Sequence, residues 1–321
     1  MVVPDDIILS VIIPTRNRPH LLTRALRSVA LQGFTGFEVC VIDNNPDTDI
    51  SNAVKIIVDE FSTKYTHLNW IYLHSDKQFA AGARNDGIFA TRGRYIAFLD
   101  DDDELLENSL HLRVKEMQID PAIALLYCAG YSMIYPYPFK MYRYYHYDKR
   151  RHKDKLMMMS CSSIMINRDL FKKHNLYFDE QQSRMDDYDL CRRVIRLGLK
   201  VKSIPNPLVQ INLHPETRIS SHQLINYDFK DVLIKRWGAP AEKVVYNYAE
   251  GVYIWRKCFG IADMRFKDIV KALKQNFNRT PTLSFRIKYL IVSISPKLFL
   301  TLYHAGVSLS QLYKNKIANN A

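Results

Sequence analysis

An acidic run directly after an apolar stretch carries the most recognisable chemistry of this chain. Asp100 to Asp103 and Glu104 follow the apolar residues 95–99, a pattern typical of a buried strand that ends in a cluster of negative charge. Adjacent carboxylates repel each other by roughly 1 kcal/mol per pair in water, and by more in a cleft. Oxygen ligands of this kind suit Mg²⁺ or Mn²⁺, which carboxylates and substrate phosphates often hold together. An acidic loop or a helix N-terminus, where the helix dipole favours acids, is the alternative interpretation.

A second acidic position is Asp43, which lies between the mostly apolar residues 37–42 and Pro46. A carboxylate there could accept a hydrogen bond from the ring N–H of a base or from a ribose hydroxyl, as acids beyond a strand do in nucleotide-binding folds. Uracil, thymine and guanine offer such a ring N–H, whereas cytosine does not. An ordinary turn, which Asp, Asn and Pro favour for local reasons, accounts for the same residues.

A third acidic position is the pair Asp186 and Asp187, which precedes the helical run of residues 191–198. The positive end of a helix keeps a carboxylate ionised, and an ionised carboxylate in a closed site can take a proton from a hydroxyl. Asp187 is therefore a candidate general base. Capping of the free backbone N–H groups of the helix would call for the same residue types.

The elements that must position these acids follow from the apolar pattern of residues 7–104, which predicts strands that alternate with helices. The predicted strands are residues 7–13, 37–42, 68–73 and 94–99, and the predicted helices are residues 19–30, 50–61 and 80–90. This β-α-β-α-β-α-β order predicts an α/β fold with a mostly parallel sheet and helices on both faces. Ligands of such sheets bind beyond the carboxyl ends of the strands, where three polar clusters (residues 14–17, 43–45 and 100–103) should converge. Neither G-x-G-x-x-G nor a P-loop occurs in this part of the chain, so we expect a metal to hold the phosphates.

Composition narrows the class of protein. The 321 residues are 47% hydrophobic, which is enough for one large domain or two ordinary ones. The five cysteines form no CxxC pair and fit a reducing compartment, and residues 1–6 carry two acids and no basic segment, so no secretory signal is expected. The net charge of +12 predicts an anionic partner, such as a nucleotide diphosphate, a phosphorylated acceptor, a lipid surface or nucleic acid. No motif of a nucleic-acid-binding protein is present.

Two later segments point to other partners. Residues 135–147 are rich in Tyr and Phe and precede the basic residues 149–151, so this loop could stack on sugar faces and bind an acidic acceptor. A hairpin packed on the sheet is the alternative. Residues 284–313 combine apolar stretches with Lys and Arg, and Pro296 and Lys297 interrupt them before about 20 residues, the length needed to span a bilayer. The segment is typical of an interfacial helix on an anionic leaflet, or of a helical appendage packed on the catalytic domain or a second subunit.

In their order and spacing these motifs resemble family 2 of the GT-A glycosyltransferases, inverting enzymes that use nucleotide sugars. The resemblance covers about residues 9–221, and it rests on residues 10–18 (Ser-Val-Ile-Ile-Pro-Thr-Arg-Asn-Arg), 38–44 (Glu-Val-Cys-Val-Ile-Asp-Asn), 83–88 (Ala-Arg-Asn-Asp-Gly-Ile), 98–105 and 186–190. It implies a GT-A domain of residues 1–221, followed by a helical, basic and amphipathic C-terminal region of residues 222–321.

The resemblance also implies roles for single residues. Asp187 matches the second residue of the family's ED motif, usually taken as the catalytic base, and Asp186 replaces the more usual Glu and is the alternate base. Asp102 matches the metal-binding acid of the DXD motif, and His214 could contact the metal or the diphosphate. The residues expected at the nucleotide sugar are Pro14, Thr15, Arg16, Asp43, Arg84, Asn85, Asp100 and Asp101.

The function implied is transfer of one sugar from a nucleotide-diphosphate sugar, with UDP-sugars favoured, to a hydroxyl of a glycan or lipid-linked acceptor. We expect Mn²⁺ or Mg²⁺ as cofactor, an anionic membrane surface as a partner through the C-terminal region, and a cytoplasmic, peripheral location in cell-surface polysaccharide or lipopolysaccharide assembly. The QxxRW motif of processive synthases is not matched, because Leu233 stands where Gln is required. A sugar nucleotidyltransferase and a catalytically silent nucleotide-binding scaffold at a membrane are the alternatives.

Overall fold

The computed structural model describes residues 7–135, 139–143, 160–214, 228–259 and 265–306. Contacts divide the chain into two compact units, one of residues 1–131 and 142–212 and the other of residues 132–141 and 213–321. The expected domain boundary at residue 221 falls outside the described residues and stays a prediction.

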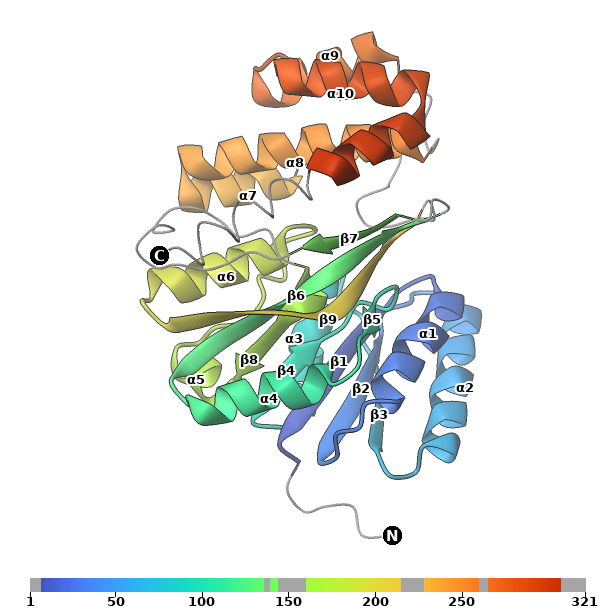
Figure 1. The fold of residues 1–321 in the computed structure, drawn as a ribbon. Coiled ribbons are helices and arrows are strands. Elements are labelled where there is room, and N and C mark those ends of the chain that lie inside the picture. The colour runs from blue at the N-terminus through green and yellow to red at the C-terminus, as the bar shows by residue number, and fades with distance from the viewer. Residues whose placement is uncertain (1–6, 136–138, 144–159, 215–227, 260–264, 307–321) are drawn as a thin grey trace. The chain divides into compact units, whose positions relative to one another are not determined.

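Strands and helices alternate along residues 9–98 (Figure 1). The predicted elements are all present, with bounds that differ by no more than three residues at either end. The elements are β1 (Leu9–Thr15), α1 (Pro19–Ala30), β2 (Phe37–Asp43), α2 (Thr48–Lys64), β3 (Asn69–His74), α3 (Ala80–Ala90), β4 (Tyr95–Phe98), β5 (Glu104–Leu105), α4 (Ser109–Ile119), β6 (Ile123–Ile134), β7 (Phe139–Arg143), the 3₁₀ turn η1 (Cys161–Ser163), β8 (Ile164–Asn167), α5 (Arg168–Lys173), α6 (Asp186–Arg196) and β9 (Lys200–Leu213).

The described strands form one mixed sheet of nine strands, in the order β3-β2-β1-β4-β8-β6-β9-β5, with β7 paired to β6. Strands β3, β2, β1 and β4 are parallel, as the βαβ pattern predicts, whereas β8 is antiparallel to both β4 and β6. In the parallel register Thr15 lies beside Asp43, and Asp43 lies beside His74. These strand ends therefore share one edge of the sheet with the acidic run that follows β4.

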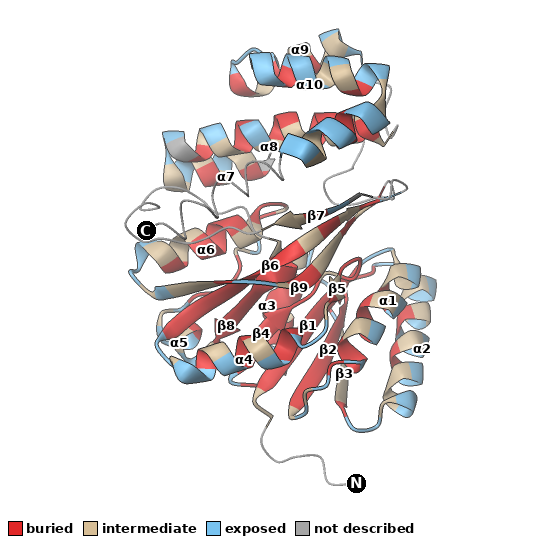
Figure 2. Ribbon diagram, in the orientation of Figure 1, coloured by how far each residue is buried: buried red, intermediate tan, exposed pale blue. Residues whose placement is uncertain are grey.

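Helices cover both faces of the sheet. Leu9, Val11 and Ile13 of β1 belong to a buried cluster that includes residues of α1, α2 and α4, whereas Ile12 belongs to a second cluster with residues of α3, α5 and α6. Successive strand residues point to opposite faces, so a strand buried on both faces has a continuous apolar sequence. Figure 2 shows β1, β2 and β4 in the colour of buried residues. The two cores fix the strand ends that carry the polar clusters.

Local sequence features set the turns at the carboxyl edge of the sheet. Asn17 has φ 60°, a left-handed conformation that Asn tolerates well, and Pro19 then begins α1. The Asp47 side chain accepts hydrogen bonds from the first free backbone N–H groups of α2. A Cβ atom at Gly87 would lie 2.6 Å from the Ile12 Cγ2 atom, so this glycine allows α3 to pack closely against β1.

The described residues of the second unit from residue 228 onward are mainly helical, with α7 (Asp228–Trp237), α8 (Ala239–Cys258), α9 (Phe266–Phe277), α10 (Leu283–Ile294) and a helix over residues 296–306. Helix α8 packs against α7, α9 and α10. The buried Glu250 of α8 accepts hydrogen bonds from the backbone N–H and the hydroxyl of Thr282 and from the Tyr246 hydroxyl, which ties the start of α10 to α8. Within the described ranges, every helix is too short or too polar to cross a membrane.

Candidate active site

The acidic run after β4 divides into two kinds of side chain. Asp101 and Asp103 are buried, and both accept hydrogen bonds from the surrounding protein. The Thr15 hydroxyl donates to Asp101 at 2.7 Å, and the backbone N–H of Asn212 and the Ser162 hydroxyl donate to Asp103 at 3.0 Å and 2.6 Å. These two acids therefore anchor the run to β1, η1 and β9.

Asp100 and Asp102 alternate with these anchors in the sequence, and each of them pairs with an arginine. Arg84 donates to Asp100 at 2.7 Å, and Arg18 donates to Asp102 at 2.8 Å. Carboxylate oxygens of Asp100, Asp102 and Asp103 lie within 4.8 Å of one another. Three hard oxygen donors at this spacing fit Mg²⁺ or Mn²⁺, and the two arginines show that this position attracts positive charge.

Arg18, directly before α1, contacts both Asp101 and Asp102, at 2.5 Å and 2.8 Å. Burial raises the pKa of the Asp101 carboxyl, the positive charge of Arg18 opposes this shift, and the neighbouring Asp102 adds to it. The backbone carbonyl of Asp102 accepts hydrogen bonds from Arg24 and from the Asn212 side chain. Both the carboxylates and the main chain of the acidic run therefore make hydrogen bonds with the surrounding protein.

Arg84 joins the acidic run to the third acidic position. Its guanidinium donates to Asp100 at 2.7 Å and to Asp186, at the start of α6, at 2.6 Å. Arg84 is buried and also lies over the ring of Phe178, 5.5 Å from its centroid. Two acids that are 86 positions apart in the sequence thus share one cation.

Asp187 is half-buried beside Asp186, and it accepts a hydrogen bond from the backbone N–H of Tyr188 at 2.7 Å. Burial raises the pKa of Asp187 to about 7, the negative charge of Asp186 adds to the shift, and the charge of Arg84 opposes it. A carboxylate with a pKa near neutrality is a better proton acceptor than an ordinary aspartate, because general bases work best with a pKa near the operating pH.

Asp43, at the end of β2, is fully buried, and both of its carboxylate oxygens accept hydrogen bonds within the protein. The Tyr72 hydroxyl donates to one oxygen at 2.6 Å, and the backbone N–H of Asn45 donates to the other at 3.1 Å. Burial would raise the pKa of Asp43, but hydrogen bonds from Tyr72, Ser51 and Asn45 lower it overall, so the carboxylate stays ionised. A direct contact of Asp43 with a base stays a prediction.

The other residues expected at the nucleotide lie at the same edge. Pro14 is buried at the end of β1, and the exposed Arg16 donates to the Gln78 carbonyl at 2.6 Å. Asn85 exchanges hydrogen bonds with the backbone of Phe178, at 2.9 Å in both directions, and so fixes the segment before α6. Contacts of these side chains with a nucleotide stay predictions.

The three polar clusters are joined by hydrogen bonds. The backbone N–H of Asn17 donates to the Asn45 side chain, and Asn44 donates through its backbone to the Thr15 carbonyl. Thr15 in turn reaches Asp101. The predicted convergence of the three strand ends is therefore present in the structure.

The roles of one candidate residue and one candidate loop are not tested by the geometry of the site. His214 follows β9 and belongs to the second unit, so its predicted contact with a metal or a diphosphate stays a prediction. Of the aromatic loop over residues 135–147 and the basic residues 149–151, the structure describes only residue 135 and residues 139–143, and the acceptor role lies mostly outside the described residues.

Several residues that shape the site were not singled out from the sequence. Arg18 lies within the matched motif after the first strand, and its position two residues beyond Arg16 was a usable signal. Ser162 and Asn212 are far from the acids they hold, 59 and 109 positions from Asp103, and no local pattern marks them. Only the antiparallel half of the sheet brings them to the acidic run.

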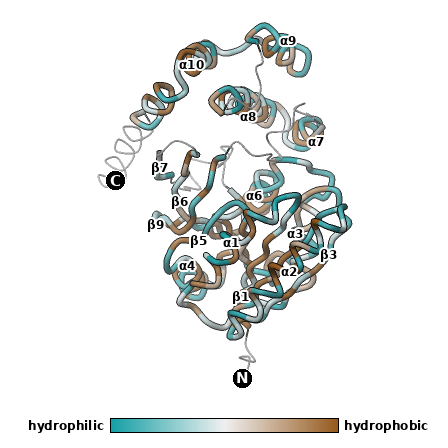
Figure 3. Tube along the Cα trace, turned by 90° about the vertical axis from the view of Figure 1, so that its right-hand side faces the viewer, coloured by the Kyte–Doolittle hydropathy of each residue, from teal (hydrophilic) through white to brown (hydrophobic). Residues whose placement is uncertain are grey.

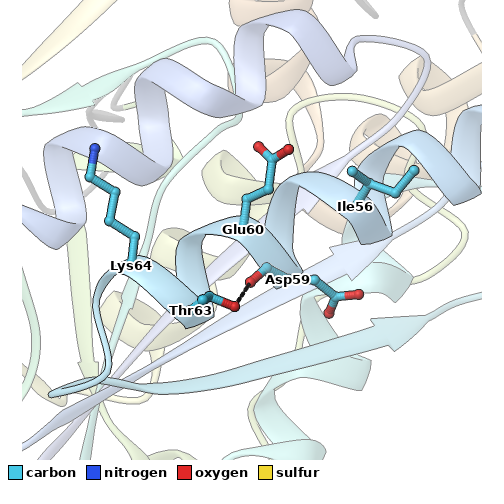
Figure 4. A pocket seen from close by; sticks show the side chains of 5 residues that line it. All are labelled: Ile56, Asp59, Glu60, Thr63 and Lys64. Atoms are coloured by element: carbon cyan, nitrogen blue, oxygen red, sulfur yellow. Dashed lines mark hydrogen bonds between the residues drawn. The ribbon is translucent and has the colours of Figure 1, made fainter.

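A surface hollow on α2 lies apart from this network. Ile56, Asp59, Glu60, Thr63 and Lys64 line it, and all of them belong to one exposed stretch of the helix (Figure 4). The Thr63 hydroxyl donates to the Asp59 carbonyl within that helix, at 2.9 Å. With one helix as its wall and no convergent groups from other elements, the hollow is not a candidate active site.

The fold and the site together define an α/β protein whose acidic strand ends form a single polar network at the carboxyl edge of a sheet. The sequence profile of Glycosyl transferase family 2 matches residues 10–174, just over half of the chain. The chain therefore belongs to glycosyl transferase family 2, and its fold is the GT-A fold of these enzymes.

Two relatives illustrate what the matched region is similar to. The GalNAc(5)-diNAcBac-PP-undecaprenol beta-1,3-glucosyltransferase of Campylobacter jejuni is 41% identical over 103 residues, which is 32% of this chain and 32% of that protein. The amylovoran biosynthesis glycosyltransferase AmsB of Erwinia amylovora is 28% identical over 240 residues, 67% of this chain and 72% of that protein. The first alignment thus spans about a third of the relative's length.

Solved structures share the fold at low sequence identity. TarS 1–349 of S. aureus, in complex with UDP-GlcNAc, superposes with a TM-score of 0.53 at 16% identity, over 89% of this chain and 79% of that chain. The mannosyltransferase PcManGT of Pyrobaculum calidifontis, in complex with GDP-Man and Mn²⁺, gives a TM-score of 0.55 at 14% identity, over 95% and 87% of the two chains.

Proposed function

We propose that this protein is a metal-dependent, inverting glycosyltransferase that moves one sugar from a nucleotide-diphosphate sugar to an acceptor hydroxyl. The observation that carries the proposal is a network of two ion pairs made by Arg84. One joins Arg84 to Asp100 of the acidic run, and the other joins it to Asp186, the neighbour of the candidate base Asp187. A donor site and a proton acceptor must lie side by side for such a transfer, and this network links the two.

Asp102, with Asp100 beside it, would hold Mn²⁺ or Mg²⁺ together with the diphosphate of the donor. The cation would neutralise the negative charge that develops on the diphosphate as it leaves the sugar. The carboxylate spacing, within 4.8 Å, and the arginines paired with both acids support this assignment.

Asp187 would take the proton of the attacking hydroxyl. Its raised pKa supports this role, because a base with a pKa of about 7 accepts a proton readily while about half of it is still ionised at neutral pH. Asp186 is already paired with Arg84, which favours Asp187 over its neighbour. A single displacement by the hydroxyl would invert the configuration at the anomeric carbon.

The nucleotide would lie along the strand ends, near Pro14, Thr15, Arg16, Asp43, Arg84, Asn85, Asp100 and Asp101. A UDP-sugar is the favoured donor, because uracil offers a ring N–H, and the name of another relative supports it. The UDP-Glc:alpha-D-GlcNAc-diphosphoundecaprenol beta-1,3-glucosyltransferase WfgD of Escherichia coli is 32% identical over 130 residues. His214 would contact the metal or the diphosphate.

The acceptor would be a glycan or a lipid-linked glycan in cell-surface polysaccharide synthesis, at the cytoplasmic face of a membrane. The names of the relatives support this setting, because two include undecaprenol and one includes amylovoran biosynthesis. Residues 1–221 would form the catalytic domain, and the helical residues 222–321 would meet the anionic membrane surface.

Incubation with UDP-, GDP- and dTDP-sugars in the presence of Mn²⁺ tests the proposal. We expect release of the nucleoside diphosphate from one of these donors, with a metal requirement that a chelator reveals. Release of pyrophosphate in a parallel incubation with nucleoside triphosphates and sugar 1-phosphates would instead identify a sugar nucleotidyltransferase, and nucleotide binding with no product in either incubation would identify a silent scaffold. Either of these results would refute a glycosyltransferase.

A further inference from the structure

Helix α10 of the second unit carries an exposed apolar stripe. Leu283, Ile287, Leu290 and Ile294 recur at spacings of three and four residues, which places them on one face of the helix. All four side chains are at least half exposed, with Leu283 at 74% and Ile294 at 70%. Figure 2 colours α10 partly as exposed, and Figure 3 shows hydrophobic segments along the same helix.

The opposite face of α10 anchors it within its own unit. Phe285 and Val292 lie half a turn away from the stripe and are buried. The ring of Phe285 stacks on Phe266 of α9, with centroids 6.3 Å apart. The helix thus has a packed inner face, so the apolar stripe is not needed for the core of the unit.

The helix of residues 296–306, which follows α10, also exposes apolar side chains. Leu298 and Leu302 are about half exposed, whereas Phe299 between them is buried against Trp255, with ring centroids 6.2 Å apart. Two consecutive helices therefore show the same division into a packed face and an exposed apolar face. Exposed apolar side chains in such a row are typical of an interaction surface rather than of chance exposure.

The segment that carries the stripe is rich in positive charge. Residues 269–321 contain eight Lys or Arg and no Asp or Glu, and residues 213–321 as a whole carry a net charge of +10 out of the chain's +12. Arg286, Lys288 and Lys297, which are close to the stripe residues in the sequence, are exposed. Exposed leucines and isoleucines next to lysines match a lipid headgroup layer, where the apolar side chains enter the acyl boundary and the cations meet anionic headgroups.

We propose that the stripe of α10, together with the exposed Leu298 and Leu302, docks this protein on an anionic membrane leaflet, with α10 lying in the plane of the interface. A second copy of the chain fits less well, because a symmetric contact would bring two strongly cationic surfaces together. The inference rests on the proposed function for its setting, since a lipid-linked acceptor places the reaction at a membrane. Beyond the proposed function, it names the residues that would contact the membrane.

Vesicle flotation tests the docking with the full chain. We expect the wild-type chain to float with phosphatidylcholine vesicles that contain about a third phosphatidylglycerol, and to bind vesicles of phosphatidylcholine alone about tenfold less. Replacement of two stripe residues, Ile287→Ser with Leu290→Ser, should lower binding to the anionic vesicles about tenfold or more. The matched control, Leu31→Ser with Ile119→Ser, removes two exposed apolar residues of α1's end and α4, and should bind like the wild type.

A charge variant and a second stripe variant complete the test. Lys288→Gln with Lys297→Gln should abolish most of the preference for anionic vesicles. Leu283→Gln with Ile294→Gln changes the two most exposed stripe residues, so it checks the result if the first variant fails to fold by circular dichroism. The proposal would be overturned if both stripe variants fold and bind anionic vesicles as strongly as the wild type does. It would also be overturned if the wild-type chain does not bind anionic vesicles, or if the stripe substitutions change only the oligomeric state.

Binding of UDP in the presence of Mn²⁺ separates this inference from the proposed function. The stripe variants should bind UDP as the wild type does, because their substitutions lie in the second unit. A chain that floats with anionic vesicles but releases no nucleoside diphosphate from any donor would keep the docking surface and refute the transferase activity.

Discussion

Arg84 Nη2 lies 2.7 Å from Asp100, and Arg84 Nη1 lies 2.6 Å from Asp186. One buried guanidinium thereby connects the acidic run after β4 with the start of α6. The pairing occupies Asp186, whereas Asp187 next to it accepts a hydrogen bond from a backbone N–H of its own helix. Asp186 is therefore the ion-pair partner of Arg84, and Asp187 is the candidate base.

The pH dependence of turnover should report the protonation of Asp187. Burial, and then the charge of Asp186, raise the pKa of this carboxyl to about 7. A general base acts only when deprotonated, so kcat/KM should rise with pH through about 7 and then level off, falling about tenfold per unit on the acid side. Steady-state kinetics between about pH 5 and pH 9 at fixed metal concentration measure this profile. A profile that stays flat down to pH 5 would exclude Asp187 as the base.

Replacing Arg84 should shift that profile. The positive charge of Arg84 lowers the pKa of Asp187, so Arg84→Gln should move the acid limb of kcat/KM to higher pH. Loss of a buried cation from two carboxylates should also destabilise the fold by about 3 kcal/mol. Arg84→Lys keeps the charge but not the two-pronged geometry, and it should restore the position of the limb better than it restores kcat. An unchanged limb in Arg84→Gln would disprove the coupling.

The acidic run should separate into binding and anchoring residues. Ser162→Ala removes the hydroxyl that donates to Asp103 and accepts from the Asp100 N–H, so it should lower the free energy of unfolding in urea by about 1–3 kcal/mol. Asp102→Asn should change stability little but abolish the gain in melting temperature that Mn²⁺ and UDP give together. Equal effects of the two substitutions on stability and on metal response would contradict the division.

Close packing at the start of β4 should be sensitive to a single methyl group. A Cβ at Gly93 would lie 2.5 Å from the backbone of Leu9 and Ser10, so Gly93→Ala should destabilise the chain by about 2 kcal/mol or more. Gly33→Ala is the matched control, because nothing lies within 4 Å of its added Cβ. Thermal or urea unfolding compares the stabilities of the two variants. Equal stabilities would show that the backbone of β1 can shift to accommodate the added methyl group.

The sequence was sufficient for the parallel half of the sheet, because each of its strands is a short apolar run and each crossover helix has clear bounds. The strand ends at Thr15, Asp43 and Asp100 followed from that topology. The antiparallel half did not follow, since β8 and β9 pair with strands that are distant in the chain. The same long range hid Ser162 and Asn212, whose contacts with the acidic run depend on tertiary packing.

The different roles of the acidic residues within each cluster could not be predicted from the sequence either. Asp101 and Asp103 are chemically identical to Asp100 and Asp102, and Asp102 is buried as they are, so only the hydrogen-bond partners distinguish the two pairs. For the same reason the sequence left Asp186 and Asp187 as alternatives. The partner that separates them, Arg84, lies about a hundred positions away on α3.

The most direct test of the central claim compares Asp187→Asn with the wild-type chain on the nucleotide sugar that the wild type uses. Because the general base acts in the transition state, we expect the variant to bind UDP and Mn²⁺ with a nearly unchanged Kd, while kcat falls by about 10²-fold or more. Asp186→Asn should lose less turnover, since that carboxylate is paired with Arg84. If Asp187→Asn turns over at the wild-type rate, or loses nucleotide binding together with activity, Asp187 is not the base of this enzyme.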